Sequence, residues 1–554
     1  SLAVVSGCDS ILDKGPLDSF TNDNFWTGEG NISGYANAFY EQFLGYGNGN
    51  GYGDFYFKTL SDDQAGMSFA KWTYPDNAPS TSATWKNGWI EVRRANIMLE
   101  NVPTVASLDE ATKNHWLGVA RLMRAWQYYH LVRMYGNLPW IDKALNINDE
   151  GEIYGNREDR DMVMDKVLED LDFAVTNIKD ISSKTTWSRS LANAMKAEVC
   201  LYEGTFRKYR KNEDGQQAPD ATGAARYLTA CKEACLAVMS KGYKLNTSYQ
   251  GNYNSTDLSS NPEMILYKAY KEGLLMHSTI DYTCSSTQIS GMSKNAFESY
   301  LFKDGKPMAL TSLNKSDEAP FQYGHLSLKA ILAVRDKRLA QTIDTVLLYN
   351  GRGFTRFNTG MESTSSTGYG VAKYDNEAIP EGFRSQSGKN YTHAPLFWLS
   401  VIYLNYAEAC AELGNITQDD LDKSINLLKD RAGLPHLNPI VGFSDPANNH
   451  GVSDLIWEIR RERRCELMFD NDNRYWDLIR WHQLDKLDTT KYPDIILGAN
   501  VANDMDGCEA NKVGKYIDGS KDGSRIYDKK HYLYPIPTGQ IALNPQLAPN
   551  NPGW

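Results

Sequence analysis

The sequence predicts a mostly α fold of tetratricopeptide-like helical repeats, together with a large loop-rich region. Apolar residues recur at spacings of three and four over about residues 90–242 and again over 398–481, as helices that face a core require. Short connections separate these helices into pairs, and the spacing is typical of tetratricopeptide units of about 34 residues. One helix pair cannot bury its apolar face alone, so we expect the pairs to stack into a solenoid.

The first helical region predicts five helices. The first ends at Pro103, and the second runs from Trp116 to Val132. That second helix stops where Gly136 supplies a C-terminal cap and Pro139 forbids continuation. The remaining three helices are predicted over Val163–Ile178, Leu191–Tyr202 and residues 224–239.

The second helical region repeats this pattern. Residues Trp398–Leu413 are apolar at helical spacing, Gly414 breaks the helix, and Leu421–Arg431 restarts it. Downstream, the segment Glu458–Glu466 contains four Arg and three Glu. Because these charges are interleaved at helical neighbour spacings, they predict ion pairs rather than a surface for nucleic acid.

Two stretches do not follow the helical repeat. Residues 20–80 are rich in Gly, Asn and aromatic residues and include the glycine-rich run Gly45–Gly53. Residues 245–395 combine Ser, Thr, Asn and Gly with many aromatic residues. Loops of such length are uncommon in a compact domain unless they are functional, so we expect ligand binding on these two segments.

Composition excludes several classes of protein. The 554 residues carry 69 Asp and Glu against 58 Lys and Arg, a net charge of -11, which argues against nucleic acid as the main partner. No run approaches the ~18 apolar residues of a membrane-spanning helix. The eight cysteines form no C-x-x-C pair, and we expect Cys231 and Cys235, four residues apart on a predicted helix, to be buried thiols.

Catalytic and metal-binding signatures are missing from the sequence. It contains no G-x-S-x-G elbow, no H-E-x-x-H helix and no G-x-x-x-x-G-K-[ST] loop. Acidic neighbours such as Asp62 and Asp63 leave glycoside hydrolysis open, since sequence does not give the separation of two carboxyl groups. We therefore expect a protein that is not an enzyme and has no cofactor. A Ca²⁺ ion stays open, although no D-x-[DN]-x-[DN]-G loop is present.

The first residues suggest a lipid anchor. The short apolar run Leu2–Val5 leads through Ser6 and Gly7 to Cys8, like the end of a bacterial lipoprotein signal peptide. We therefore predict that Cys8 carries the lipid and that residues 1–15 are a signal remnant and tail. The alternative is that residues 2–5 are merely a frayed apolar start.

Motifs spread along the chain resemble the SusD/RagB family, the surface glycan-binding lipoproteins of Bacteroidetes. Glu462–Phe469 followed by Arg474–Trp481 resembles the family pattern E-R-x-x-E-L…R-x-x-D-L-x-R-W. The segment Asp470–Asn473 departs from the family, which more often has Glu-Gly there, and we expect only a changed turn. Further matching segments are Arg124–Pro139, Asp304–Pro307, Arg335–Leu339, Asn405–Ala409, Arg431–Pro435 and Leu533–Pro537.

This resemblance implies a single domain over residues 16–554 with about four tetratricopeptide-like units. It also implies a location on the cell surface at the outer membrane. The implied partner is a SusC-like TonB-dependent β-barrel transporter, over which such proteins sit as a lid.

Aromatic and acidic residues of the first loop-rich stretch are candidates for a sugar site. Trp72 and Tyr74 could offer flat rings to a sugar, because Trp and Tyr combine a large rigid face with a polar tip. Packing in a small satellite core is the alternative for Trp72. Asp54 and Asp63 are candidate acceptors for sugar hydroxyls. Trp85 and Trp89, four residues apart at the opening of the first helix, are expected to pack in the core instead.

The second loop-rich stretch adds further candidates. The resemblance implies that a loop at this position lines the glycan site, which selects Tyr282 and Cys284. Arg352 and Arg384 could donate to sugar hydroxyls through their forked guanidinium groups, or they could be ordinary surface charges.

Three functions remain open from sequence. The first is non-catalytic binding of an oligo- or polysaccharide for import through the barrel. The second keeps the fold and the partner but replaces the glycan with a peptide, as in the RagB branch. The third is a glycoside hydrolase.

Overall fold

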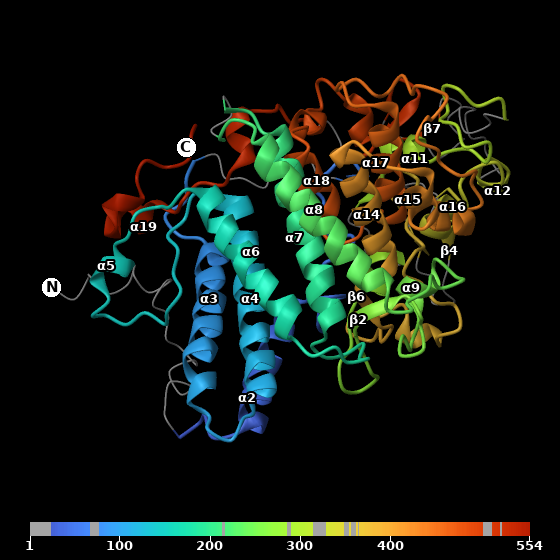
Figure 1. The fold of residues 1–554 in the computed structure, drawn as a ribbon. Helices are drawn as coiled ribbons and strands as arrows, with labels where there is room; N and C mark the ends of the chain where they lie inside the picture. Colours follow the sequence, from blue (N-terminus) through green and yellow to red (C-terminus); the bar gives the residue numbers. More distant parts are fainter. Residues whose placement is uncertain are drawn as a thin grey trace. The chain divides into compact units, whose positions relative to one another are not determined.

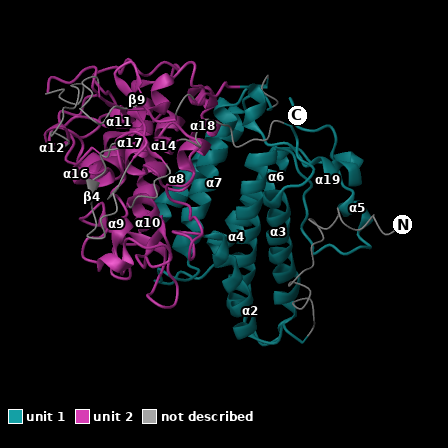
Figure 2. Ribbon diagram, turned by 180° about the vertical axis from the view of Figure 1, so that it is seen from behind, with its two compact units in different colours: residues 1–43, 74–238, 528–554 teal, residues 44–73, 239–527 magenta. Residues whose placement is uncertain are grey.

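The computed structural model describes residues 24–66, 77–212, 216–284, 290–313, 328–347, 354–355, 362–363, 365–501, 512–520 and 523–554. The chain divides into two compact units (Figure 2). Unit 1 comprises residues 1–43, 74–238 and 528–554, and unit 2 comprises residues 44–73 and 239–527. The single domain predicted over residues 16–554 stays a prediction.

Unit 1 is a bundle of long helices that run alongside one another (Figure 1). Helix α4 packs against α3 and α6, and α7 packs against α6. Paired antiparallel helices of this kind confirm the mostly α, tetratricopeptide-like prediction. The helices are α2 (Glu29–Ala36), α3 (Ala83–Asn101), α4 (Glu110–Tyr135), α5 (Glu150–Ile153), α6 (Arg160–Asn177), α7 (Arg189–Tyr209), α8 (Ala221–Met239) and α19 (Thr538–Leu543).

Polar caps set where the first long helices begin. The side chain of Ser82 accepts the Trp85 amide at 3.2 Å, and that of Asp109 accepts the Thr112 amide at 2.7 Å. Helix α3 thus opens close to Trp85, as predicted, whereas α4 starts six residues before the predicted Trp116, since apolar spacing marks the core face and a cap marks the end. Helix α4 ends at Gly136, whose φ is +73°, as predicted.

Glycines let the helices of unit 1 approach closely. A Cβ on Gly88 of α3 would lie 2.5 Å from Leu131 of α4, and one on Gly118 would lie 2.9 Å from Ile178. The adjoining core contains Trp85 and Trp89, each 1% exposed, which confirms their predicted core packing.

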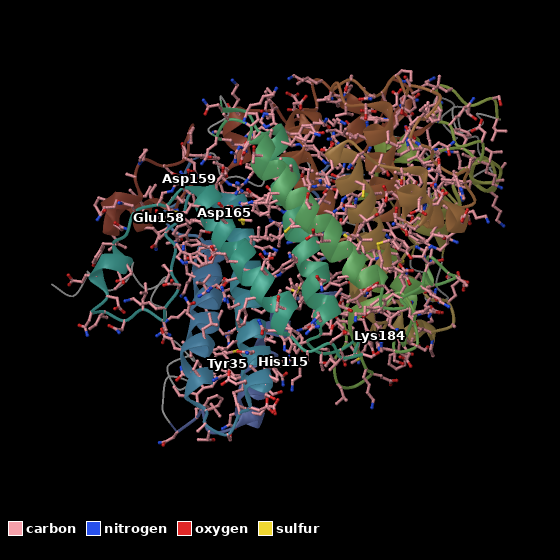
Figure 3. The ribbon with its side chains drawn as sticks, viewed as in Figure 1. Tyr35, His115, Glu158, Asp159, Asp165 and Lys184 are labelled. Atoms are coloured by element: carbon pink, nitrogen blue, oxygen red, sulfur yellow. The ribbon has the colours of Figure 1, made fainter. Side chains whose placement is uncertain are left out.

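Polar side chains tie the two ends of this bundle (Figure 3). Asp165 on α6 accepts the Tyr227 hydroxyl of α8 at 2.7 Å and pairs with Arg207 of α7 at 3.2 Å. Toward the opposite end, His115 accepts the Lys179 amide at 2.9 Å, and Tyr35 of α2 donates to a carbonyl of α3. These contacts fix the register between neighbouring helices.

Unit 2 combines short helices with small antiparallel sheets. Strand β2 (Met264–Lys268) pairs with β6 (Ala394–Trp398), and β1 (Gln64–Ala65) pairs with β3 (Gly291–Met292). Strands β4 (Phe354–Thr355) and β5 (Glu362–Ser363) form a third pair, and β7 (Leu497–Asn500), β9 (Tyr516–Asp518) and β8 (Lys512–Val513) form a sheet in that order. The helices are α9 (Gly251–Asn254), α10 (Thr279–Cys284), α11 (Lys294–Ser299), α12 (Lys329–Leu332), α13 (Lys337–Thr342), α14 (Leu399–Leu413), α15 (Gln418–Asp422), α16 (Ile425–Ala432), α17 (Asp454–Glu466) and α18 (Asn473–Arg480).

The prediction of one helix in unit 2 is wrong. The expected continuous helix Leu421–Arg431 is divided into α15 and α16, with a turn at Lys423 and Ser424. Ser424 adopts φ -136° and ψ -101°, which is not helical. Apolar spacing continues across the turn, so periodicity alone did not reveal it.

The charge-rich helix α17 is buried and makes ion pairs, as predicted. Arg461 pairs with Glu458 inside the helix at 3.0 Å. Arg463 and Arg464 reach Asp477 and Asp63, at 2.8 and 2.7 Å. The partners of α17 thus come largely from distant parts of the chain, which local spacing did not show.

Six cysteines lie in the described part of the chain. All are buried and none forms a disulfide, which confirms the buried thiols predicted for Cys231 and Cys235; the six are Cys200, Cys231, Cys235, Cys284, Cys410 and Cys465. No described helix combines the length and the apolar character that a membrane span requires. Cys8 lies outside the described residues.

The buried carboxylate of Glu408 makes the stability of unit 2 depend on pH. It accepts from Arg480 Nη2 at 2.9 Å and from Trp481 Nε1 at 3.0 Å. Burial opposes ionisation, but the Arg480 guanidinium holds the pKa of Glu408 at about 2, below its ordinary 4.5. Because the folded-state pKa is the lower one, this stabilisation is present above pH 4.5 and is lost as the pH falls toward 2.

We expect Glu408→Gln to lower the free energy of unfolding at pH 7 by about 3 kcal/mol. Urea denaturation at a series of pH values should show this difference from wild type shrinking as the solution is acidified. The exposed Glu377 provides the control E377Q, which should change little. A difference that stays constant at every pH would contradict the role of the Glu408 charge.

Candidate functional site

The glycine-rich run forms a tightly closed loop in unit 2. The Asp54 amide donates to the Gly45 carbonyl at 2.8 Å, which joins the two ends of the loop. Gly47 has φ +81°, and a Cβ there would lie 2.6 Å from the Gly51 carbonyl oxygen. A Cβ on Gly53 would lie 2.2 Å from the Gly45 carbonyl oxygen. Glycine is therefore required at both positions for the backbone to close.

Hydrogen bonds from buried side chains hold this loop in place. Tyr46 is fully buried, and its hydroxyl donates to the Tyr253 carbonyl. The Tyr270 hydroxyl donates to the Gly47 carbonyl at 2.7 Å, and the Ser278 hydroxyl donates to the Gly49 carbonyl at 2.7 Å. The loop is thus fixed by its surroundings as well as by its own turns.

Three aromatic rings gather beside the loop. Tyr52 stacks on Phe57 with ring centroids 4.6 Å apart, and the ring of Tyr282 in α10 lies nearly perpendicular to both, with centroids 5.5 and 6.0 Å away. Tyr52 is 59% exposed, while Phe57 and Tyr282 are half-buried. We call these three residues the aromatic patch. Partly exposed rings on a rigid base offer flat apolar faces at little cost in conformational entropy.

Polar groups lie around the aromatic patch. The Tyr282 hydroxyl donates to the Asn50 carbonyl at 2.9 Å, which links α10 to the loop. Ser387 donates to Asp281 at 3.2 Å, and the Gly388 amide donates to Ser278 at 2.7 Å. Ser278 and Asp281 are buried, so these contacts hold α10 beside the loop, and Asn50 is the exposed polar residue next to the rings.

The predicted site residues fall into different settings. Tyr282 lies in the aromatic patch, and Asp54 lies at the end of the glycine loop. Asp54 is half-buried, and burial raises its pKa although Lys58 opposes the shift. Three further predicted residues lie outside the described part of the chain: Trp72, Tyr74 and Arg352.

The other predicted site residues are buried and contact other residues of the chain. Asp63 pairs with Arg464 at 2.7 Å. The Cys284 thiol is 1% exposed and lies against the Val371 carbonyl at 3.5 Å. Arg384 donates two hydrogen bonds to Asp375, at 2.9 and 2.8 Å. These contacts are structural, and the predicted contact of Asp63, Cys284 and Arg384 with a ligand stays a prediction.

Comparison with protein families identifies the chain's relatives. The model described as the SusD family matches residues 237–554, more than half of the chain. The chain belongs to the SusD family. A second family model, described as starch-binding and associating with the outer membrane, matches residues 22–201. The resemblance drawn from the sequence motifs is confirmed.

Curated SusD-like relatives match most of the chain. SusD-like protein P38 of Formosa agariphila is 24% identical over 494 residues, which cover 87% of this chain and 89% of the relative. A SusD-like protein of Bacteroides ovatus is 24% identical over 498 residues, which cover 85% of this chain and 79% of the relative.

Solved structures of SusD-like proteins share the fold. A SusD-like carbohydrate binding protein of Bacteroides fragilis matches with a TM-score of 0.70 at 20% identity, covering 95% of this chain and 100% of that one. A laminarin binding SusD-like protein matches with a TM-score of 0.57 at 20% identity, covering 95% and 100%. A structure with xylogluco-oligosaccharide matches with a TM-score of 0.60 at 16% identity, covering 93% and 97%. At these identities the likeness shows the fold alone.

Sequence reasoning missed two members of the aromatic patch in this SusD-family chain. The glycine-rich run drew attention to the right segment, but Tyr46 and Tyr52 have the same local pattern, each followed by Gly. The structure buries Tyr46 and exposes Tyr52. Phe57 carries no separate signal, because a Phe near a loop is more often part of the core.

The glycine loop can be tested by adding one methyl group. Gly53→Ala places a Cβ against the Gly45 and Gly47 backbone, so we expect the loop to open and the protein to lose roughly 1–3 kcal/mol of stability. Hydrogen exchange should show faster exchange of the Gly47 and Asp54 amides. The control is Gly382→Ala, where a Cβ meets nothing within 4 Å. Unchanged exchange in G53A would mean that the loop is not closed as described.

Proposed function

We propose that this protein binds an oligo- or polysaccharide on the aromatic patch and does not cleave it. The observation that carries the proposal is the arrangement of Tyr52, Phe57 and Tyr282 as partly exposed rings on a closed loop. A sugar ring has an apolar C–H face that packs against an aromatic ring, while its hydroxyls need polar partners. Binding of this kind needs no proton transfer and no nucleophile.

Polar groups at the edge of the patch are candidates for the sugar hydroxyls. Asn50 is exposed and adjoins the segment at Gly388, where a Cβ would lie 3.2 Å from the Asn50 side-chain oxygen. The Asp54 carboxylate lies where the loop closes. Trp72 and Tyr74 remain proposed contacts on the strength of the sequence.

The family supports a carbohydrate ligand without naming one. Relatives of this fold are described as binding laminarin or were solved with a xylogluco-oligosaccharide, and one matching family model is described as starch-binding. These glycans differ in linkage, so the proposal names the class and not a single sugar. A peptide ligand, as in the RagB branch, is the alternative that the binding experiment separates.

We further propose where the protein acts. A lipid on Cys8 would hold it at the outer membrane, since each buried methylene contributes ~0.8 kcal/mol. It would then deliver its glycan to a SusC-like TonB-dependent β-barrel and cover that transporter as a lid. The family model described as associating with the outer membrane supports this location.

The glycan proposal is tested by affinity electrophoresis in gels cast with starch, laminarin or xyloglucan. We expect retention of the wild-type chain on at least one of them, weakened at least tenfold by Tyr52→Ala or Phe57→Ala. Tyr243→Ala, which removes a half-exposed ring outside the patch, is the control and should leave retention unchanged.

Three results would count against the proposal. Equal retention of Y52A, F57A and wild type would exclude the patch as the site. Release of new reducing ends from the glycan would indicate a hydrolase. Binding of peptides with no retention on any glycan would favour the RagB-like alternative.

The proposed lipid anchor has its own test. In cells that express the protein from its own gene, we expect Cys8→Ala to move the protein from the membrane fraction to the soluble fraction, because the acylated thiol is lost. Immunoblots of the fractions measure this change. A Cys508→Ala variant is the control, and retention of C8A in the membrane fraction would disprove the anchor.

A further inference from the structure

A separate cavity of about 480 Å³ lies within unit 2. Its lining comes from α11, α17, α18 and the turns Leu484–Leu487 and Pro493–Ile496, and it includes none of the three rings of the aromatic patch. The volume falls within the ~300–1,000 Å³ range of small-molecule sites. The lining includes Asp62, Asn295, Trp457, Arg464, Arg474 and Lys486.

The arginines of the cavity already have carboxylate partners. Arg474 donates two hydrogen bonds to Asp62, at 2.7 and 2.8 Å. Arg464 pairs with Asp63 at 2.7 Å and donates to the Asn295 side chain at 2.9 Å. These guanidinium groups are fixed in place, and their charge is balanced locally.

Lys486 differs from these arginines. It lines the cavity and is only 9% exposed, yet within the described ranges no hydrogen bond or ion pair reaches its ammonium. Its close neighbour is the Trp457 ring, 4.6 Å from the nitrogen. Burial, together with the nearby Arg474, lowers the pKa of Lys486 to about 7 although Asp62 opposes the shift. A buried ammonium without a counter-ion is costly, and an anion from solution would relieve that cost.

The other lining residues of the cavity indicate which chemical groups a ligand would have besides its anionic group. Pro307, Met308, Pro446 and Ile495 join Trp457 to give the cavity apolar surface as well as charged groups. Asp494 also lines the cavity and accepts from Asn295 at 2.9 Å. Fixed carboxylates close to the site disfavour a doubly charged anion such as phosphate, because the second charge would meet repulsion.

We propose that this cavity binds a small organic acid, with one carboxylate on the Lys486 ammonium and a compact ring against Trp457. The singly charged carboxylate matches Lys486, the ammonium of the described lining that no carboxylate contacts directly, and the apolar side chains accommodate the ring. The site is distinct from the aromatic patch and binds its ligand independently of it.

The test compares three probes by isothermal titration calorimetry on the full chain: glucuronate, glucose and inorganic phosphate. We expect glucuronate to bind at least tenfold more tightly than glucose or phosphate. Lys486→Met should weaken glucuronate at least tenfold, while Lys491→Met, an exposed lysine of the same segment, leaves it unchanged.

Stability separates a binding role from a structural one. Because no described carboxylate makes a direct ion pair with the buried Lys486, we expect K486M to unfold at the same temperature as wild type or at a higher one. A lower unfolding temperature would show that the ammonium supports the fold and would overturn the proposal. Equal glucuronate affinity in wild type and K486M, no glucuronate binding, or a preference for phosphate would overturn it as well. The Y52A variant should bind glucuronate normally, which keeps this result independent of the glycan site.

Discussion

Charge pairing around the buried helix α17 is the interaction on which unit 2 depends. Arg338 contacts Asp336, Glu462 and Glu466 at 2.7, 2.5 and 2.7 Å, and all four side chains are 1% exposed. Glu466 also pairs with Arg431 at 2.5 Å. Removing one member would leave a buried charge unpaired, which costs about 3–5 kcal/mol. The network therefore stabilises the fold only when every member is in place, and it fixes α13, α16 and α17 against one another.

A second group of buried polar contacts reaches the glycine loop. The Tyr253 hydroxyl donates to Asp470, and Lys373 pairs with that carboxylate at 2.8 Å. The Tyr253 carbonyl in turn accepts from Tyr46, the buried residue at the root of the loop. Burial raises the pKa of Asp470 to about 6 although Lys373 opposes the shift. Asp470, in the segment that departs from the family pattern, thus supports the glycine loop, whereas the sequence predicted only a changed turn.

The helices and the family could be predicted from the sequence because each is indicated by patterns among residues close together in the chain. Apolar spacing located α4 and α14, and the spacing of Trp85 and Trp89 predicted their burial. The site did not follow in the same way, because Tyr46 and Tyr52 differ only in what the rest of the chain places over them. Asp63 looked like a ligand acceptor because its partner, Arg464, lies 401 residues away in the sequence. Long-range pairing of this kind has no signature in a single sequence.

The chemistry of the two candidate sites leads to different kinds of selectivity. Stacking on Tyr52 and Phe57 depends on an apolar face that many sugars present. The rings therefore contribute affinity for many sugars and distinguish little between them. Several polar groups nearby already hold the loop, as Tyr282 does with Asn50 and Ser278 with Gly49. Specificity for one glycan must then come from the polar groups at the edge of the patch that remain available to sugar hydroxyls. Lys486 instead favours a negatively charged ligand. A neutral ligand would not reduce the free-energy cost of burying its ammonium. A tolerant patch and a charge-selective cavity can therefore act in one chain without competing for the same ligand.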